Sequence, residues 1–145
     1  MNRKRNLILI AVLFLFIGGA AATQSNKNDH VYWLITSSVK EGQLDNLKAL
    51  GAEMVSATLK NEPGTLHYDW TLSEDGKTCF FFEHYKDSAA VMIHTKTFGE
   101  KYADRIFTMI DIKSFEIFGN PSDEVKEVYA GFGAHFNESI GGFSR

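Results

Sequence analysis

The stretch from residue 65 to residue 85 constrains the fold of this chain more than any other. Between residues 66 and 72, leucine or aromatic residues alternate with polar ones, which is the period-two pattern of a strand with two different faces. An Asp-Gly pair follows within residues 74–77 and favours a tight hairpin turn. The phenylalanine-rich segment Thr78–Tyr85 completes the pattern. The sequence therefore predicts two antiparallel strands joined by a short turn.

Helical and strand patterns flank this hairpin. Val31–Val39 is β-branched and aromatic without a breaker, and it is predicted to be a strand. Over residues 42–61, apolar residues recur at helical spacing until Pro63 and Gly64 end the pattern. Asp87 is placed to cap a second helix.

The second helix carries one inward stripe, formed by Val91, His94, Phe98 and Tyr102. Residues 97–100 match a capping box, so we expect a break near Thr95 and a restart. Residues 112–118 are predicted to be the last strand. The order β-α-β-β-α-β is that of a ferredoxin-like α+β domain over residues 31–118.

A sheet of this kind has helices on one face only, so its other face needs a cover. The Phe-Phe-Phe run at residues 80–82 would place large apolar side chains on that face. The economical cover is a second copy packed sheet to sheet, and we therefore expect a homodimer.

The two ends of the chain extend this domain. Residues 1–22 combine a basic start, an apolar run over residues 7–17 and three alanines, as a secretory signal peptide does. A spanning helix needs roughly 20 apolar residues, so this run is short for a permanent membrane anchor. We therefore expect cleavage after Ala22 and a periplasmic or secreted protein without a stable anchor. An uncleaved N-terminal anchor is the alternative. Residues 23–30 form a short N-terminal extension.

Residues 119–145 form a C-terminal arm. Asn120 is expected to cap a helix with Pro121 in its first turn, and an apolar stripe follows. This helical arm either docks on its own domain or partner, or forms a lid over a pocket.

Composition excludes several classes of function. The net charge of −3 falls to about −6 once the signal is removed, and no basic stripe would bind nucleic acid. Cys79 is the only cysteine, so no intrachain disulfide forms, and we expect a buried, inert thiol. The five histidines are scattered without metal spacing, and no phosphate loop or serine elbow is present. An aromatic content of 13% instead favours a cavity for a small aromatic molecule.

Two motifs carry a family resemblance. Residues 61–70 read Asn-Glu-Pro-Gly-Thr-Leu-His-Tyr-Asp-Trp, and residues 83–90 read Glu-His-Tyr-Lys-Asp-Ser-Ala-Ala ahead of the lone His94. This succession resembles the antibiotic biosynthesis monooxygenase family over about residues 31–118. The resemblance implies a dimeric α/β barrel that oxygenates electron-rich aromatics, such as hydroquinols, with dioxygen and without metal or flavin.

The resemblance also suggests site residues. The resemblance makes His94 the candidate acceptor of a phenolic proton. Periodicity alone instead favours a core histidine whose ring is satisfied by a backbone carbonyl. Glu83 would hold His94 or the substrate hydroxyl, or play a structural role in the sheet. The expected substrate-binding residues are Trp33, Tyr68, Trp70, Phe81, Tyr85, Val91 and Phe98.

The chain departs from the family pattern at one point. Many members carry a second histidine before a phenylalanine six residues after the inward one, whereas here Thr97 precedes Phe98, four residues after His94. Two alternatives therefore stay open: a non-catalytic ligand-binding protein and a haem-degrading relative. The second is disfavoured because such relatives use a tryptophan on the second helix, and no tryptophan follows Trp70.

Overall fold

The computed structural model describes residues 29–142. The expected signal peptide, most of the N-terminal extension and residues 143–145 lie outside the described residues. Within residues 29–142, none of the helices has the length and apolar character needed to cross a membrane.

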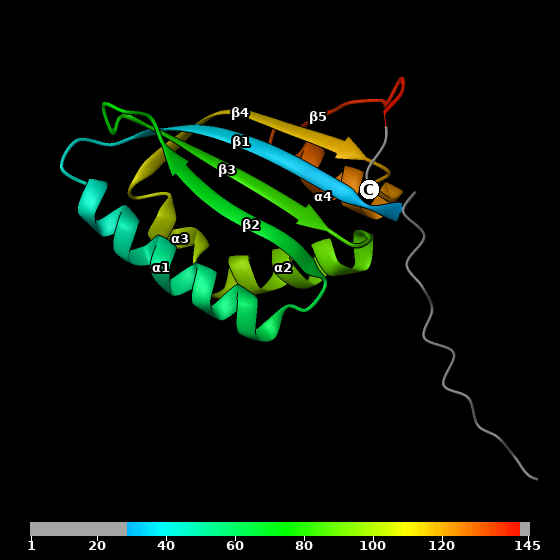
Figure 1. Ribbon diagram of the computed structural model, residues 1–145, viewed down its shortest axis with the longest axis horizontal. Coiled ribbons are helices and arrows are strands. Elements are labelled where there is room, and N and C mark those ends of the chain that lie inside the picture. The colour runs from blue at the N-terminus through cyan, green and yellow to red at the C-terminus, as the bar shows by residue number, and fades with distance from the viewer. Residues whose placement is uncertain (1–28, 143–145) are drawn as a thin grey trace, which may run out of the picture.

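A five-stranded sheet forms one layer of the domain (Figure 1). Its strand order is β2-β3-β1-β4-β5. The first four strands in this order pair antiparallel with one another, and β5 pairs parallel with β4. The strands are β1 (Val31–Val39), β2 (Thr65–Leu72), β3 (Thr78–Tyr85), β4 (Ile110–Gly119) and β5 (His135–Phe136). The first four have the ferredoxin-like order, so the predicted α+β fold class is confirmed. The two-residue β5 was not predicted.

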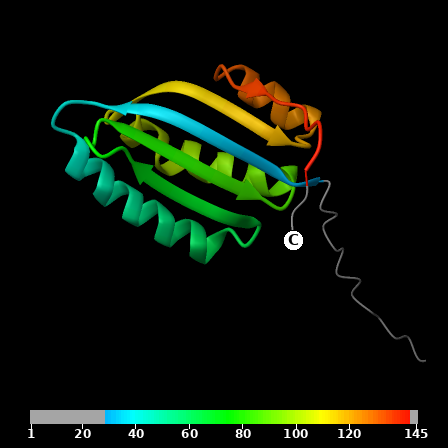
Figure 2. The same cartoon turned by 45° about the horizontal axis from the view of Figure 1, so that its top comes forward.

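The helices α1 (Leu44–Asn61), α2 (Ser88–Lys101) and α3 (Ala103–Ile106) cover one face of this sheet (Figure 1). The helix α4 (Asp123–Ala130) contacts α2 and lies along the β4 side of the domain (Figure 2). The Asp87 carboxylate accepts a hydrogen bond from the Ala90 N–H at 2.8 Å, which confirms the predicted cap of α2.

The predicted break in α2 is wrong. The helix runs unbroken to Lys101, and the Thr97 hydroxyl donates to the Ile93 carbonyl at 3.1 Å instead of capping a new turn. Interior packing of the inward stripe favours a continuous helix over the local capping signal.

The predicted start of α4 is also displaced. Ser122 is the cap, and its hydroxyl accepts from the Val125 N–H at 3.3 Å. Asn120 and Pro121 therefore precede the helix. Pro121 is buried before the cap and takes no part in the first turn.

The buried side chains form two clusters on the helix face. One contains Trp33, Tyr85, Val91 and the arm residues Val125 and Tyr129. The other contains core residues of α1, β3, α2–α3 and β4, namely Leu47, Leu50, Met54, Cys79, Phe81, Tyr102, Ile106 and Ile110. Because the first cluster includes α4, the C-terminal arm packs on its own domain.

The opposite face of the sheet carries no helix (Figure 1). Alternate residues of β1 and β3 point to it, and Phe82 remains 42% exposed there. His84 also lies on this face, where its ring stacks on Tyr32 at 4.0 Å and its Nε2 lies 2.8 Å from Nδ1 of His30.

We predict that Gly119→Ala will destabilise the fold by at least about 2 kcal/mol. Gly119 has φ +88°, and an added Cβ would lie 2.1 Å from the His30 carbonyl oxygen. Urea denaturation measures the loss. Gly99→Ala is the matched control, because its added Cβ meets no group within 4 Å inside α2, and we expect it to be neutral or stabilising by about 0.5–1 kcal/mol. Equal stability of the two variants would contradict this prediction.

Candidate active site

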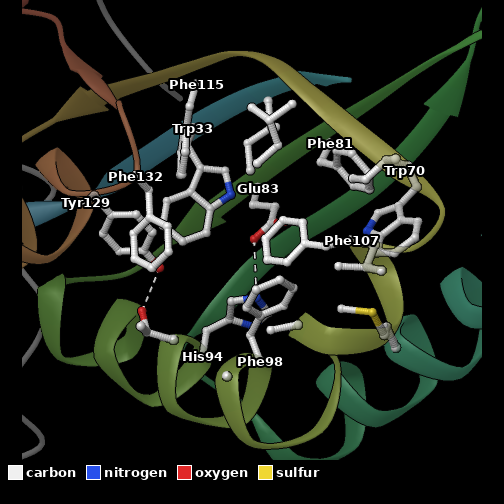
Figure 3. A pocket seen from close by; sticks show the side chains of 18 of the residues that line it. Trp33, Trp70, Phe81, Glu83, His94, Phe98, Phe107, Phe115, Tyr129 and Phe132 are labelled. Carbon is white, nitrogen blue, oxygen red and sulfur yellow. Dashed lines mark hydrogen bonds and ion pairs between the residues drawn. The ribbon is translucent and has the colours of Figure 1, made fainter. Parts of the chain in front are cut away.

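A cavity of about 200 Å³ lies between the two core clusters, and we call it the main cavity (Figure 3). Its wall is aromatic, from Trp33, Tyr68, Trp70, Phe81, Phe98, Phe107, Phe115, Tyr129 and Phe132. The volume is below the roughly 300–1,000 Å³ typical of sites for drug-sized ligands. The cavity therefore suits a small, largely apolar molecule.

His94 borders this cavity between two glutamates. Its Nδ1 lies 2.8 Å from an Oε2 oxygen of Glu62, and its Nε2 lies 3.7 Å from Oε2 of Glu83. Glu83 also accepts a short hydrogen bond from the Tyr85 hydroxyl. The three charged or chargeable side chains are 4–5% exposed. We call His94, Glu62 and Glu83 the acid–base cluster.

Local sequence places Glu62 where it meets His94. Pro63 and Gly64 end α1, and the Glu62 N–H still donates to the Thr58 carbonyl as the last bond of that helix. The Thr65 hydroxyl donates to the Glu62 carboxylate at 3.3 Å. The glutamate side chain is thereby directed across to α2.

Burial and charge act in opposite directions on His94. Burial lowers its pKa, but the hydrogen bond to Glu62 and the charges of both glutamates raise it, and the net shift is upward. Burial raises the pKa of Glu83, against the lowering effects of His94 and of the Tyr85 hydrogen bond. When Nδ1 donates its proton to Glu62, the remaining ring nitrogen of His94 is free to accept one.

Most of the sequence-predicted site residues meet at the cavity. His94, Glu83 and five of the seven expected substrate-binding residues border it, namely Trp33, Tyr68, Trp70, Phe81 and Phe98. The ring of Phe98 stacks on His94 at 6.3 Å, so the four-residue spacing still places an aromatic ring beside the imidazole. The structure places Tyr85 and Val91 behind the wall, where both are 0% exposed. Tyr85 supports Glu83 from there.

Sequence reasoning did not assign several residues of this region to the site, among them Glu62, Tyr129 and Phe132. Glu62 was visible only as part of the Glu-Pro-Gly motif, and nothing indicated that it would face His94. Tyr129 and Phe132 of the arm border the cavity, and the Tyr129 hydroxyl lies 2.6 Å from that of Thr95. The apolar stripe of the arm was the only signal for these two aromatic residues.

The other chemically interesting groups lie elsewhere. His67 packs its ring on Phe82 at 5.3 Å, on the face of the sheet opposite the cavity. Burial raises the pKa of the Cys79 thiol to about 11, so this cysteine is a poor nucleophile. In the part of the chain that the structure describes, no three histidine, cysteine or acidic residues are grouped to hold a metal ion.

The aromatic cavity and the buried acid–base cluster of this ferredoxin-like domain are features of a site for a small molecule. The sequence profile of the family described as antibiotic biosynthesis monooxygenase matches residues 30–103, about half of the chain. The chain belongs to the antibiotic biosynthesis monooxygenase family. Family membership supports a monooxygenase-type or small-ligand-binding role.

Solved structures share the fold. MupZ from Pseudomonas fluorescens is 26% identical with a TM-score of 0.70, and the match covers 81% of this chain and 96% of that one. A provisionally described antibiotic biosynthesis monooxygenase from Bacteroides thetaiotaomicron is 19% identical with a TM-score of 0.56, covering 67% and 91%. Another from Nitrosomonas europaea is 19% identical with a TM-score of 0.54, covering 66% and 93%. The last two show a common fold alone. No curated protein sequence matches the chain.

We predict that Glu62→Gln will lower the pKa of His94 while leaving the fold intact. The amide can still accept the Nδ1 hydrogen bond but no longer supplies a negative charge. In the wild type, the upward shift means that His94 stabilises the fold below its ordinary pKa of 6.5, and this contribution is lost as the pH rises through the folded-state pKa.

An NMR titration of the imidazole measures this shift. Glu53→Gln is the control, because Glu53 pairs with Arg105 at the surface and should leave His94 unchanged. An unaltered His94 pKa in Glu62→Gln would remove Glu62 from the acid–base cluster.

Proposed function

We propose that this protein is a cofactor-independent monooxygenase that oxidises a small hydroquinol or other phenolic aromatic with dioxygen. The observation that carries this proposal is the buried His94, held between Glu62 and Glu83 at the wall of an aromatic cavity. Membership of the antibiotic biosynthesis monooxygenase family supports the reaction class.

Binding would place a flat ring among the aromatic side chains of the main cavity. Trp33 meets Phe115 edge to face at 5.5 Å and Tyr129 at 5.1 Å, so this part of the wall is rigid. A ring seated there excludes water, and its hydroxyl would point towards the acid–base cluster as the polar part of the wall.

His94 would then take the phenolic proton. A phenol has a pKa near 10, so a neutral imidazole is a weak base towards it in water. The hydrogen bond to Glu62 and the charge of Glu83 raise the pKa of His94, which strengthens it as a base. The imidazolium formed lies between two carboxylates, and this arrangement stabilises its charge.

The phenolate carries the redox chemistry. It donates one electron to dioxygen, and the resulting superoxide and phenoxyl radical combine at an ortho or para ring carbon that bears hydrogen. The His94 imidazolium returns its proton to the peroxide anion formed. The hydroperoxide then loses water: its C–H proton is removed, the O–O bond breaks with release of hydroxide, the proton and the hydroxide form the water, and the carbon becomes a carbonyl. One oxygen atom enters the quinone product and the other leaves as water, so the substrate and dioxygen account for every electron.

A second candidate is a non-catalytic protein that binds a small ligand. The low exposure of His94, 5%, favours it, because both imidazole nitrogens already face carboxylates. In that function the acid–base cluster would only join α1, α2 and β3.

We predict that His94→Ala will lower the rate of oxygen uptake with a hydroquinol by about 10²-fold to 10⁴-fold. Because the base must be neutral, wild-type activity should rise with pH through the His94 pKa, at a midpoint above the ordinary 6.5. An oxygen electrode with a panel of hydroquinols and anthrones measures both effects.

The control for this experiment is His135→Ala. The His135 side chain is 72% exposed and lies away from the cavity, so its loss should leave the rate unchanged. Equal rates in wild type and His94→Ala would remove His94 from the mechanism. No oxygen uptake with any substrate would favour the binding protein.

We also propose that the protein acts as a homodimer joined through the open face of the sheet. Phe82 and Phe118 are 42% and 39% exposed there, and burying them stabilises an interface by about 25 cal/mol per Å² of apolar area.

We predict that Leu34→Glu combined with Phe82→Glu will give a monomer in sedimentation velocity. Leu59→Glu, at an 85% exposed position on α1, should remain a dimer. A wild-type monomer at micromolar concentration would contradict the dimer.

A further inference from the structure

The charges around the main cavity are unbalanced. Of its described lining residues, none is lysine or arginine, and His94 is the one side chain that can carry a positive charge. Glu83 also borders the cavity, and Glu62 lies one hydrogen bond behind His94. Two carboxylates thus share a single imidazole.

This imbalance makes the binding of a negatively charged ligand in the main cavity unfavourable. Even with His94 protonated, the acid–base cluster carries no net positive charge, because the Glu62 carboxylate offsets the imidazolium and Glu83, whose pKa burial raises, is neutral or negative. The rest of the wall is largely aromatic and aliphatic and has no cation to offset a ligand carboxylate. An anion that enters such a cavity loses its hydration and meets no cation, and neutral donors such as the indole N–H groups of Trp33 and Trp70 offset that loss only in part.

We propose that the main cavity selects its ligand by charge, accepting a neutral phenolic aromatic and excluding analogues that carry a carboxylate, sulfate or phosphate. The phenolic part of this statement rests on the proposed function. The charge rule concerns binding alone, and it holds whether or not the bound phenol is oxidised.

A substitution at the solvent-exposed edge of the cavity can test the charge rule by adding a cation. Phe132 and Phe107 border the cavity (Figure 3). They are also 61% and 40% exposed, so they lie where the wall meets solvent. A lysine at position 132 would place a cation beside an anionic ligand with little change in buried packing.

The first experiment measures binding by isothermal calorimetry without oxygen at about pH 8, where a carboxylic acid is ionised. The three probes are 2-naphthol, 6-hydroxy-2-naphthoate and the methyl ester of the latter, which matches its size without its charge. We expect the naphthol and the ester to bind, and the carboxylate to bind at least about 100-fold more weakly than the ester.

Carboxylate affinity within about threefold of the ester would overturn the charge rule, since that ratio is under one kcal/mol. Absence of binding by both neutral probes would overturn it as well. Binding of the neutral probes combined with no oxygen uptake in air from any hydroquinol would instead remove the proposed oxygenase and leave the charge rule standing.

The second experiment changes the protein. Phe132→Lys should bind 6-hydroxy-2-naphthoate about tenfold more tightly than wild type does, and should bind the ester no more tightly. Phe136→Lys is the matched control: it adds the same charge to the same arm, at a 37% exposed position that does not border the cavity. Equal gains in the two variants, or no gain in Phe132→Lys, would overturn selection by local charge.

Discussion

The contact on which the candidate site depends is the clamp of His94 between Glu62 and Glu83. It joins the end of α1, the middle of α2 and the centre of β3 in one buried cluster. Each charge is unfavourable alone in an apolar interior, and the attraction between His94 and each glutamate offsets part of that cost. The clamp therefore holds the two long helices in place over the sheet, and in the proposed function it also gives an otherwise apolar cavity a proton-transfer group. Under that proposal, the same three side chains have both a structural and a chemical role.

The cavity exists because the core is divided. The cluster around Trp33 and the cluster around Met54 are each buried, and the space between them is bordered by members of both. The C-terminal arm completes the wall through Tyr129 and Phe132, beyond the segment that matches the family profile. Its hydrogen bond from Tyr129 to Thr95 lies one residue from His94, so the arm and the acid–base cluster are linked through α2. This link makes the arm part of the site.

The two faces of the sheet contribute to different parts of the molecule. Odd-numbered residues of β1 and β3 point to the helices, and they supply Trp33, Phe81 and Glu83 to the cavity. Even-numbered residues point to the open face, where His84 sits among aromatic rings and its pKa is lowered by burial and by the nearby histidines. A single strand thus serves the ligand site on one side and the proposed interface on the other. The strict alternation of a pleated strand keeps these two functions apart.

The sequence alone determined the four long strands, the two long helices and the faces that they bury, but not α3 or β5. Period-two alternation, the Asp-Gly turn and the Asp87 cap predicted the strands and the start of α2, and helical spacing predicted that His94 points inward. Local signals failed where packing opposed them: Thr97 lies inside a continuous helix, and Ser122 rather than Asn120 caps α4. Only the tertiary structure brought Glu62 to His94 across 32 residues, moved Tyr85 and Val91 behind the wall and added the arm to it. The physical reason is that periodicity and capping act within one element, whereas the partners of a side chain are set by how separate elements pack against each other.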